Sequence, residues 1–242
     1  MALITGKNLI NWLLGTNSSD IMIGNRGFDF MNGQDGHDLM VTFRGDDELR
    51  AGYGNDTMLG GSGNDIMDGN GGADLMIGGS GNDIYYLDNP QDRIWEFSRG
   101  GTDEVRAWID TTLQSEVENL TLLDSASNGT GNSLANVITG NGRANTLSGA
   151  AGRDTLIGGG GDDTLVGGSG GDLFVFTAGG GHDVITDFSF AAGDRIGRGA
   201  GMSYTLRSNA AGDAVIVFSG EDDVTLTGIR RDQVKASWFV AA

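Results

Sequence analysis

The 242-residue sequence predicts an all-β protein with two arrays of stacked parallel strands, a short β-rich spacer between them and a C-terminal β cap. Three observations lead to this prediction. The chain contains 44 glycines but a single proline. A nine-residue motif repeats along much of its length. Each motif ends in a short segment with an apolar centre, which is typical of a brief β-strand.

The first array covers residues 15–86 as eight consecutive nine-residue units. The fourth position is glycine in every unit except the first, where it is Ser18, and the register extends backward through residues 6–14, with Asn11 at the sixth position. The sixth position is aspartate in all eight units: Asp20, Asp29, Asp38, Asp47, Asp56, Asp65, Asp74 and Asp83. The eighth position is apolar throughout: Met22, Met31, Met40, Leu49, Met58, Met67, Met76 and Tyr85.

The second array begins at Gly131 and runs through five units, with a sixth after the insertion of Phe176 and Thr177. Its first two units carry asparagine at the sixth position. The sixth positions are Asn136, Asn145, Asp154, Asp163, Asp172 and Asp183.

Each unit predicts a tight glycine-rich turn followed by a three-residue strand. Glycine accepts the positive φ angles of such turns, and the two-residue alternation of a strand points the eighth position inward. Two units make one 18-residue coil with a strand on each side. Six of the eight methionines lie on the resulting ladder, and we interpret them as core packing rather than as redox or metal ligands.

Interruptions of the repeat divide the chain into four predicted parts. Residues 1–86 hold the first array and residues 131–186 the second. Between them, residues 87–130 alternate apolar and polar residues around Arg99-Gly100-Gly101-Thr102, a pattern that predicts a β-hairpin spacer. Residues 187–242 are again apolar and β-like, and form the predicted cap.

Composition excludes several classes of function. The net charge is −18, from 15 basic and 33 acidic residues, whereas nucleic-acid binding needs a basic surface. With no cysteine, disulfides and thiolate metal sites are excluded. No stretch has the roughly 20 apolar residues of a transmembrane helix. The N-terminal residues do not form a secretory signal peptide.

We expect no enzymatic activity. His37 and His182 are the two histidines, and both occupy the fifth position of a predicted turn, where a side chain faces solvent. A Ser-His-Asp triad is therefore not expected. The spacer offers four carboxylates as the remaining acid–base candidates, which we interpret as structural: Glu96, Glu104, Glu116 and Glu118.

Stacking the coils places aspartates 18 residues apart one above another. A column of like charges opposes folding, as does the entropy of a glycine-rich chain. A hard divalent cation between successive turns reverses that effect. Calcium accepts about 6–8 oxygen ligands in flexible geometry, whereas magnesium needs a stricter octahedron. Zinc and copper prefer histidine or cysteine ligands, and the chain has two histidines and no cysteine.

The unit GGSGNDIMD at residues 60–68 fits the pattern G-G-x-G-x-D-x-U-x, where U is a large apolar residue. Over about residues 6–186 the chain resembles the RTX (repeats-in-toxin) family of calcium-binding proteins. The resemblance implies parallel β-rolls with each ion between turns 18 residues apart. Both position-six carboxylates would bind it, with carbonyls two and four of the first turn and one and three of the second.

The resemblance implies about eight calcium sites. The carboxylate pairs are Asp20–Asp38, Asp29–Asp47, Asp38–Asp56, Asp47–Asp65, Asp56–Asp74, Asp65–Asp83, Asp154–Asp172 and Asp163–Asp183. The implied carbonyl ligands in the first array are Thr16, Ser18, Asn25, Gly27, Gly33, Gln34, Asp35, Gly36, Thr42, Phe43, Arg44, Gly45, Ala51, Gly52, Tyr53, Gly54, Gly60, Gly61, Ser62, Gly63, Gly69, Gly71, Gly78 and Ser80. Those in the second array are Ala150, Gly152, Gly159, Gly161, Gly167, Ser169, Ala178 and Gly180.

Some units depart from the family pattern. Asn11, Asn136 and Asn145 each remove a charge, so we expect weak or empty sites there and coils that act as caps. Thr42 and Phe43 replace the glycine pair in one unit. The ending SWFVAA, residues 237–242, resembles the C-terminal portion of RTX proteins exported by type I secretion, which implies an uncleaved C-terminal signal.

Our leading hypothesis is a secreted, non-enzymatic calcium-binding protein that folds on binding extracellular calcium. It would reside outside the bacterial cell or at its surface, with the type I transporter as a partner during export. One alternative is a self-assembling surface-layer, filament or matrix protein held together by calcium, which would bind itself or a cell-surface polysaccharide. Another is the secretion and folding module of a larger RTX enzyme, such as a protease, lipase or alginate epimerase.

Overall fold

The computed structural model describes residues 1–7, 9–199, 201–218 and 222–241. Within these residues the secondary structure consists of β-strands and two short 3₁₀ helices, which confirms the predicted all-β class. Asn8, in the backward extension of the first array, and Ala242, the last residue of SWFVAA, lie outside the described residues. The chain forms two compact units, residues 1–109 with 114–119 and residues 110–113 with 120–242.

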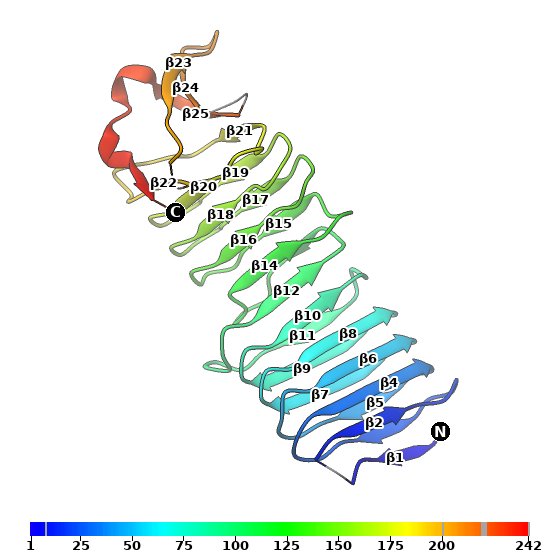
Figure 1. Ribbon diagram of the computed structural model, residues 1–242. Coiled ribbons are helices and arrows are strands. Elements are labelled where there is room, and N and C mark those ends of the chain that lie inside the picture. The colour runs from blue at the N-terminus through cyan, green and yellow to red at the C-terminus, as the bar shows by residue number, and fades with distance from the viewer. Residues whose placement is uncertain (8, 200, 219–221, 242) are drawn as a thin grey trace. The chain divides into compact units, whose positions relative to one another are not determined.

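In the first unit, consecutive strands alternate between two parallel sheets, so the chain winds as a solenoid (Figure 1). One sheet has the order β1-β3-β5-β7-β9-β11 and the other contains β2-β4-β6-β8-β10-β12. The strands are β1 (Leu3–Thr5), β2 (Asn11–Leu14), β3 (Ile21–Ile23), β4 (Asp29–Asp35), β5 (Leu39–Val41), β6 (Glu48–Tyr53), β7 (Thr57–Ser62), β8 (Ile66–Gly71), β9 (Leu75–Ser80), β10 (Ile84–Leu87), β11 (Arg93–Trp95) and β12 (Glu104–Ala107).

The strand register has the predicted 18-residue offset, and the position-eight ladder is the core. Met22, Met40, Met58 and Met76 pair in succession across β3, β5, β7 and β9. The opposite ladder runs through Met31, Leu49, Met67 and Tyr85. All eight side chains are fully buried. Because each coil is thin, these residues bury their apolar surface mainly against their neighbours above and below.

At the fourth position of the turn that contains Gly54, glycine is required for two reasons. Gly54 has a φ of 144°, which L side chains rarely adopt. A Cβ on Gly54 would also lie only 1.4 Å from the carbonyl oxygen of Gly36 in the preceding coil. Position two has positive φ in several turns, and Gln34 (75°) and Asn70 (54°) are accepted there. The turn therefore requires glycine most strictly where coils make backbone contact.

The predicted hairpin around Arg99–Thr102 is wrong. β11 pairs in parallel with β9, and β12 pairs in parallel with β10, so the two strands lie in different sheets. The segment between them is a longer turn of the same solenoid, in which Arg99 has a φ of 70°. A turn signal between alternating segments does not specify where the second strand pairs, and here the open edges of β9 and β10 receive the two strands.

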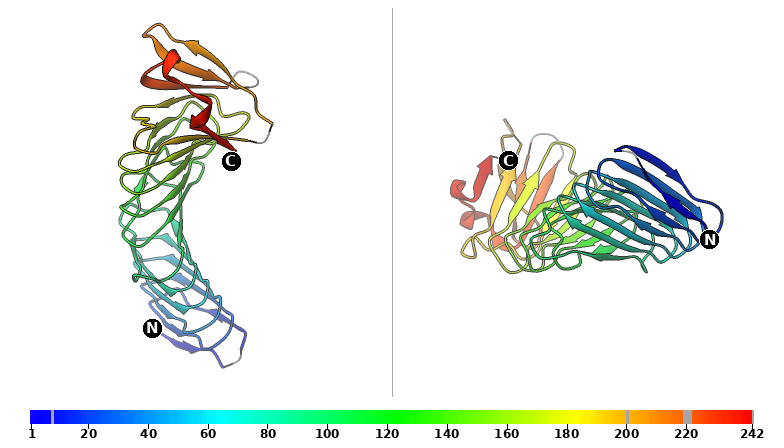
Figure 2. Two further views of the ribbon diagram at one scale, coloured as in Figure 1. Left: turned by 90° about the vertical axis from the view of Figure 1, so that its left-hand side faces the viewer. Right: turned by 90° about the horizontal axis from the view of Figure 1, so that it is seen from below.

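The second unit is also a two-sheet solenoid, ending in an antiparallel segment (Figure 2). One sheet has the order β13-β15-β17-β19-β21-β25-β24-β23, and the other contains β14-β16-β18-β20-β22-β26. The strands are β13 (Thr111–Thr112), β14 (Asn119–Leu122), β15 (Asn128–Thr130), β16 (Val137–Thr139), β17 (Thr146–Ser148), β18 (Thr155–Ile157), β19 (Thr164–Val166), β20 (Leu173–Phe176), β21 (His182–Ile185), β22 (Arg195–Arg198), β23 (Thr205–Ser208), β24 (Asp213–Val217), β25 (Asp223–Arg230) and β26 (Phe239–Ala241).

The core of the second unit follows the same rule. Ile138, Leu156 and Phe174 pair in succession along one sheet and are fully buried. Leu147 and Leu165 do the same along the other. The predicted ladder therefore continues through the second array.

The predicted β cap closes the second unit. β23, β24 and β25 pair antiparallel, while β25 joins β21 and β26 joins β22 in parallel. The 3₁₀ helices Arg231–Gln233 and Ala236–Trp238 link β25 to β26. Trp238 packs against Phe188 and Phe190, with ring centroids 5.0 and 5.6 Å apart. This aromatic cluster buries the end of the ladder.

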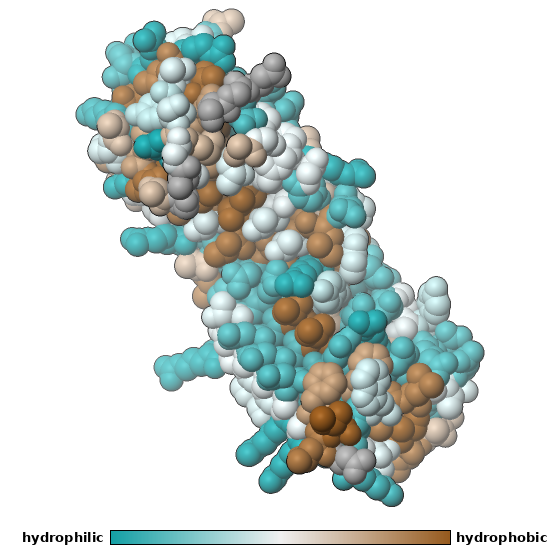
Figure 3. All heavy atoms as spheres, in the orientation of Figure 1, coloured by the Kyte–Doolittle hydropathy of each residue, from teal (hydrophilic) through white to brown (hydrophobic). Residues whose placement is uncertain are grey.

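Apolar side chains reach the surface around the first strands (Figure 3). Leu3, Trp12 and Leu14 expose 68 %, 73 % and 64 % of their surface. Among the described residues, no helix is both long enough and apolar enough to span a membrane.

Candidate calcium sites

The position-six aspartates of the first array form two buried columns, one at each end of the coils. None of the eight exposes more than 3 % of its surface. One column contains Asp20, Asp38, Asp56 and Asp74, and the other contains Asp29, Asp47, Asp65 and Asp83. Buried carboxylates without nearby cations are costly, so the columns need a partner.

Each carboxylate uses its two oxygens differently. The backbone N–H of Asp38 donates to Oδ1 of Asp56 at 2.7 Å, and the N–H of Asp56 donates to Oδ1 of Asp74 at the same distance. The second oxygen, Oδ2, is buried and has no hydrogen-bond partner within the described residues at nine positions. These are Asp38, Asp47, Asp56, Asp65, Asp74, Asp83, Asp154, Asp163 and Asp172. An unpaired buried acceptor that recurs at these nine turns suits a bound cation.

Backbone carbonyls converge on the same gaps between turns. At the Asp38–Asp56 pair, the carbonyls of Gln34 and Gly36 point toward the next coil. A Cβ on Gly52 would lie 1.8 Å from the carbonyl oxygen of Gln34, and a Cβ on Gly54 would lie 1.4 Å from that of Gly36. The carbonyl of Tyr53 points back and accepts the N–H of Gly36 at 2.7 Å. These are the second and fourth carbonyls of one turn and the third of the next.

The first position of the turn completes the oxygen set. At Gly33, the point that a Cβ would occupy lies 2.3 Å from Oδ2 of Asp38 and 2.5 Å from the carbonyl oxygen of Ala51. Glycine therefore leaves room for oxygens from two turns to face each other. An all-oxygen set of carboxylates and carbonyls, in an adaptable turn, fits calcium better than zinc or copper.

The second array repeats this arrangement. At Gly149, Oδ2 of Asp154 and the carbonyl of Gly167 lie 2.3 and 2.6 Å from the position of a Cβ. The N–H of Asp154 donates to Asp172 at 3.0 Å. Across the two-residue insertion, the N–H of Asp163 donates to Asp183 at 2.9 Å. All eight predicted carboxylate pairs are thus adjacent in the stack, with the predicted carbonyl residues in the turns beside them.

The three asparagines close their turns with hydrogen bonds. Oδ1 of Asn136 accepts the N–H of Asn132, and Oδ1 of Asn145 accepts the N–H of Asn141, each at 2.8 Å. Asn11 donates from its amide to Oδ1 of Asp29. A neutral amide therefore stands where the other turns carry a carboxylate.

Thr42 places a side-chain hydroxyl beside the Asp47–Asp65 pair. Its side chain fills the first position of the turn, and its hydroxyl donates to the carbonyl of Gly60. That carbonyl is one of the oxygens predicted for this site. The threonine hydroxyl is therefore an additional oxygen in this gap.

Four of the six candidate catalytic residues make the following contacts. His37 Nδ1 accepts the N–H of Asn55 at 2.7 Å in the first unit. His182 Nδ1 lies 3.3 Å from Oδ2 of Asp223 in the second. Glu104 pairs with Arg106 at 2.9 Å, and Glu118 accepts the N–H of Asp103 at 2.8 Å.

Residues 14–49, 41–76, 50–85 and 130–174 match the RTX calcium-binding nonapeptide repeat in four copies. The two arrays belong to the RTX calcium-binding family. The resemblance drawn from the sequence is thereby confirmed, and the arrays are calcium-binding parallel β-rolls. The specific ligand sets remain predictions.

Among solved structures, this chain is similar to the extracellular lipase LipA from Serratia marcescens. The match has 21 % sequence identity and a TM-score of 0.32, over 96 % of this chain. This chain spans 40 % of the length of that lipase chain. No curated protein matches the sequence significantly.

The RTX columns extend beyond the repeats through three aspartates that the sequence analysis missed. Asp92, Asp103 and Asp194 accept the N–H groups of Asp74, Asp83 and Asp172 at 3.1, 2.8 and 2.9 Å. All three are buried. Asp92 follows Asp74 by 18 residues, so its spacing was a usable signal. The other two follow their partners by 20 and 22 residues, and these insertions hid them.

Burial changes the acidity of the RTX aspartates. Loss of solvation, with repulsion from neighbouring aspartates, raises the pKa of Asp65, Asp74 and Asp183 to about 7. The same causes raise the pKa of Asp38 to about 6. Hydrogen bonds, the largest from the backbone of Ala2, instead lower the pKa of Asp20 at the start of its column. Charge in the middle of a column is therefore unfavourable unless a cation balances it.

Proposed function

We propose that this chain is a secreted, non-enzymatic protein that folds when it binds extracellular calcium at about eight sites. The observation that carries the proposal is the column of buried aspartates with an unpaired Oδ2 at successive turns. At Gly33, Gly60 and Gly149, the position of a Cβ lies within 3.0 Å of both such an oxygen and a carbonyl of the next turn. This is an oxygen set for a hard cation, repeated at the period of the fold.

Calcium changes the electrostatic contribution of the aspartate pairs to folding from unfavourable to favourable. Without a cation, desolvation and repulsion raise the free energy of each ionised pair. A cation that binds only the folded chain lowers the free energy of that state by mass action. Because each coil contacts only its neighbours, adjacent sites should load together. Extracellular calcium modules bind at roughly 10⁻⁴–10⁻³ M, so the chain would remain unfolded in the cytosol and fold outside.

Secretion through a type I transporter is part of the proposal. Its support is the membership of the arrays in the RTX family and the resemblance of the C-terminal residues to exported RTX proteins. A narrow channel suits a chain that stays unfolded where calcium is scarce. The proposed location is extracellular or at the bacterial cell surface.

Circular dichroism tests calcium-dependent folding directly. The full chain should lack most of its β signal in chelator and gain it in millimolar calcium, whereas equimolar magnesium should restore little. Size-exclusion chromatography should show compaction in parallel. Equal β content in chelator and calcium would overturn the proposal.

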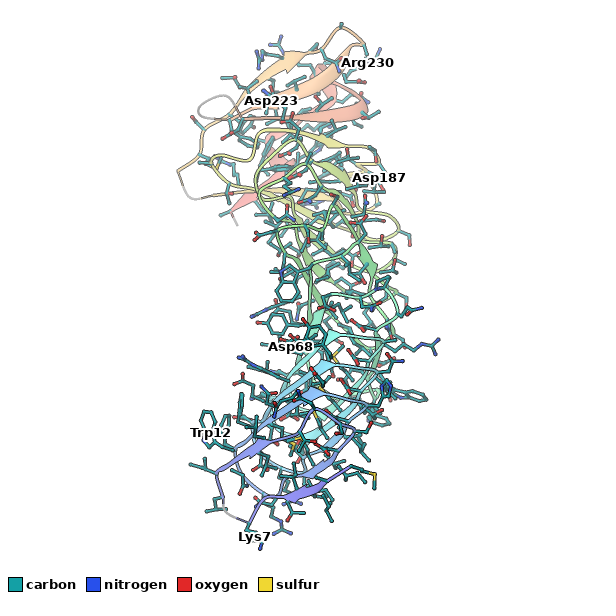
Figure 4. All side chains as sticks on the ribbon, turned by 90° about the vertical axis from the view of Figure 1, so that its right-hand side faces the viewer. Lys7, Trp12, Asp68, Asp187, Asp223 and Arg230 are labelled. Carbon is teal, nitrogen blue, oxygen red and sulfur yellow. The ribbon has the colours of Figure 1, made fainter. Side chains whose placement is uncertain are left out.

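Self-assembly is a second candidate, and one observation favours it. Trp12 and Leu14 lie exposed on β2, and the Trp12 side chain points outward (Figure 4). Calcium-dependent light scattering that Trp12→Ser abolishes would support a matrix or filament role. The third candidate, a module of a larger RTX enzyme, is tested by the sequence of the full gene.

A further inference from the structure

Three carboxylates meet where the first array ends. Asp83, Glu96 and Asp103 each place an oxygen within 4.8 Å of the others. Their exposed fractions are 1 %, 7 % and 1 %. Asp83 ends the turn before β10, whereas Glu96 and Asp103 begin and end the turn between β11 and β12, so two turns of the first unit supply them.

This cluster differs from the sites of the repeats. In the repeats, the first position of the turn is glycine or another residue without a carboxylate, and contributes a carbonyl. Here the turn is two residues longer, and Glu96 stands at the equivalent of that position. Its side chain enters the gap, because a Cβ on Gly78 would lie 2.2 Å from Oδ2 of Asp83 and 2.4 Å from Oε1 of Glu96.

An unpaired buried oxygen points into the cluster. Oδ2 of Asp83 has no hydrogen-bond partner within the described part of the chain. Carbonyls also face this gap: those of Gly79 and Gly81 lie 2.8 and 1.7 Å from the positions of Cβ atoms on Gly100 and Gly101. The cluster thus combines the carbonyls of an RTX turn with a third carboxylate.

Tyr85 fixes the third carboxylate in place. It is the aromatic residue of the first array's position-eight ladder, is fully buried, and its hydroxyl donates to Oε1 of Glu96. A methionine at this position could not donate such a hydrogen bond. Tyr85 therefore acts as a positioning residue for Glu96.

We propose that Asp83, Glu96 and Asp103 form a further calcium site that closes the first array and binds calcium more tightly than the two-carboxylate sites. The inference rests on the proposed calcium binding of the repeats. Calcium affinity rises with the number of charged ligands, and three carboxylates exceed the two of each repeat pair. This site fills first as calcium rises, and the first array folds from this end.

The decisive variant is Glu96→Gln in the full chain, with Glu116→Gln as the matched control. Glutamine keeps the size and the acceptor for Tyr85 but removes the charge, while Glu116 lies outside the cluster. Equilibrium dialysis against radioactive calcium counts the bound ions. Glu96→Gln should weaken the tightest site at least tenfold, with smaller effects on the weaker sites that load beside it, and the control should match the wild type.

Two results separate this inference from the function on which it rests. If the wild type binds no calcium, the proposed function fails. If the wild type binds calcium and Glu96→Gln binds the same number of ions with the same affinities, the three-carboxylate site is overturned.

Tyr85→Phe keeps the test decisive should Glu96→Gln fail to fold. Loss of the hydroxyl should weaken the tightest site roughly tenfold, the lower end of outer-shell effects at metal sites, with smaller effects on the other sites. In a folded Glu96→Gln background, Tyr85→Phe should have a smaller further effect on that site, because the side chain that Tyr85 positions no longer carries a charge. An unchanged tightest site in Tyr85→Phe would overturn the proposal.

Discussion

The backbone N–H of Asp65 donates a 2.7 Å hydrogen bond to Oδ1 of Asp83, the aspartate 18 residues further along the chain. Oδ2 of Asp65 remains buried and unpaired within the described residues. The same relationship recurs through both arrays. One carboxylate per turn thus both links two coils and presents an oxygen to the gap between them.

An aspartate in the middle of a column belongs to two carboxylate pairs, whereas the aspartate at the end belongs to one. Substitutions at the two places should therefore remove different numbers of bound calcium ions. Asp56 belongs to two pairs, with Asp38 and with Asp74, whereas Asp20 pairs only with Asp38. Asp56→Asn should therefore lose two bound ions and Asp20→Asn one, as counted by equilibrium dialysis at saturating calcium. Equal losses would show that the 18-residue pairing does not define the sites.

Close backbone contact between coils predicts that Gly54→Ala is strongly destabilising. Its Cβ would meet the carbonyl oxygen of Gly36 at 1.4 Å, at a φ of 144°. Overpacking and backbone strain together cost about 3 kcal/mol or more. Urea unfolding at fixed, saturating calcium measures the change.

Gly142→Ala is the matched control for Gly54→Ala. A Cβ on Gly142 meets no atom within 4 Å, so the free energy of unfolding should change by less than about 1 kcal/mol. A similar loss in both variants would mean that glycine content in general, rather than contact between coils, limits stability.

The sequence was sufficient to predict the repeating part of the fold. Period nine determines which side chains point inward, so Met58 and Met67 could be placed in the core and Asp56 opposite Asp74 before any coordinates. These predictions succeed because in a solenoid a local pattern also determines the long-range contacts.

Prediction failed where the period is interrupted. Insertions place Asp103 and Asp194 at offsets of 20 and 22 residues, and a count by 18 passes over both. Glu96 follows Gly78 by 18 residues, so the count places it at the first position of a turn, but that position contributes a carbonyl in the repeats and the pattern does not mark its side chain as a ligand. The mistaken hairpin at Arg99 has the same origin, because alternation and a turn do not distinguish antiparallel return from continued parallel coiling.

The raised pKa values predict that acid favours the calcium-free fold. The pKa of Asp65 and Asp74 is about 7 in the folded chain, against an ordinary value of 3.8. Protons therefore bind the folded state more tightly, so this contribution to stability is complete below about pH 4 and is lost as pH rises through 6 to 7. In chelator, circular dichroism should show more β structure at pH 5 than at pH 8.

Two comparisons identify the buried aspartates as the source of that pH dependence. Asp65→Asn removes one such group and should reduce the difference between pH 5 and pH 8. Asp232→Asn removes an exposed charge, with 81 % of its side chain accessible, and should leave the difference nearly unchanged. Identical curves for the two variants would attribute the effect to net charge alone. With calcium present, the sign reverses, because protons compete for the same oxygens.

A C-terminal export signal predicts that deletion of residues 222–242 abolishes secretion without affecting the first array. The deletion removes β25 and β26, which pair with β21, β24 and β22 in the second unit, so no strand of the first unit loses a partner. Calcium-induced folding of residues 6–86 should persist in the purified truncated chain, measured by protection from trypsin.

Full-length Asp172→Asn is the matched control for the deletion. It perturbs pairs in the second array but keeps the C-terminal residues, so it should still reach the medium. Secretion of the truncated chain through its transporter would place the signal elsewhere, while retention of both variants would attribute the defect to folding of the second array.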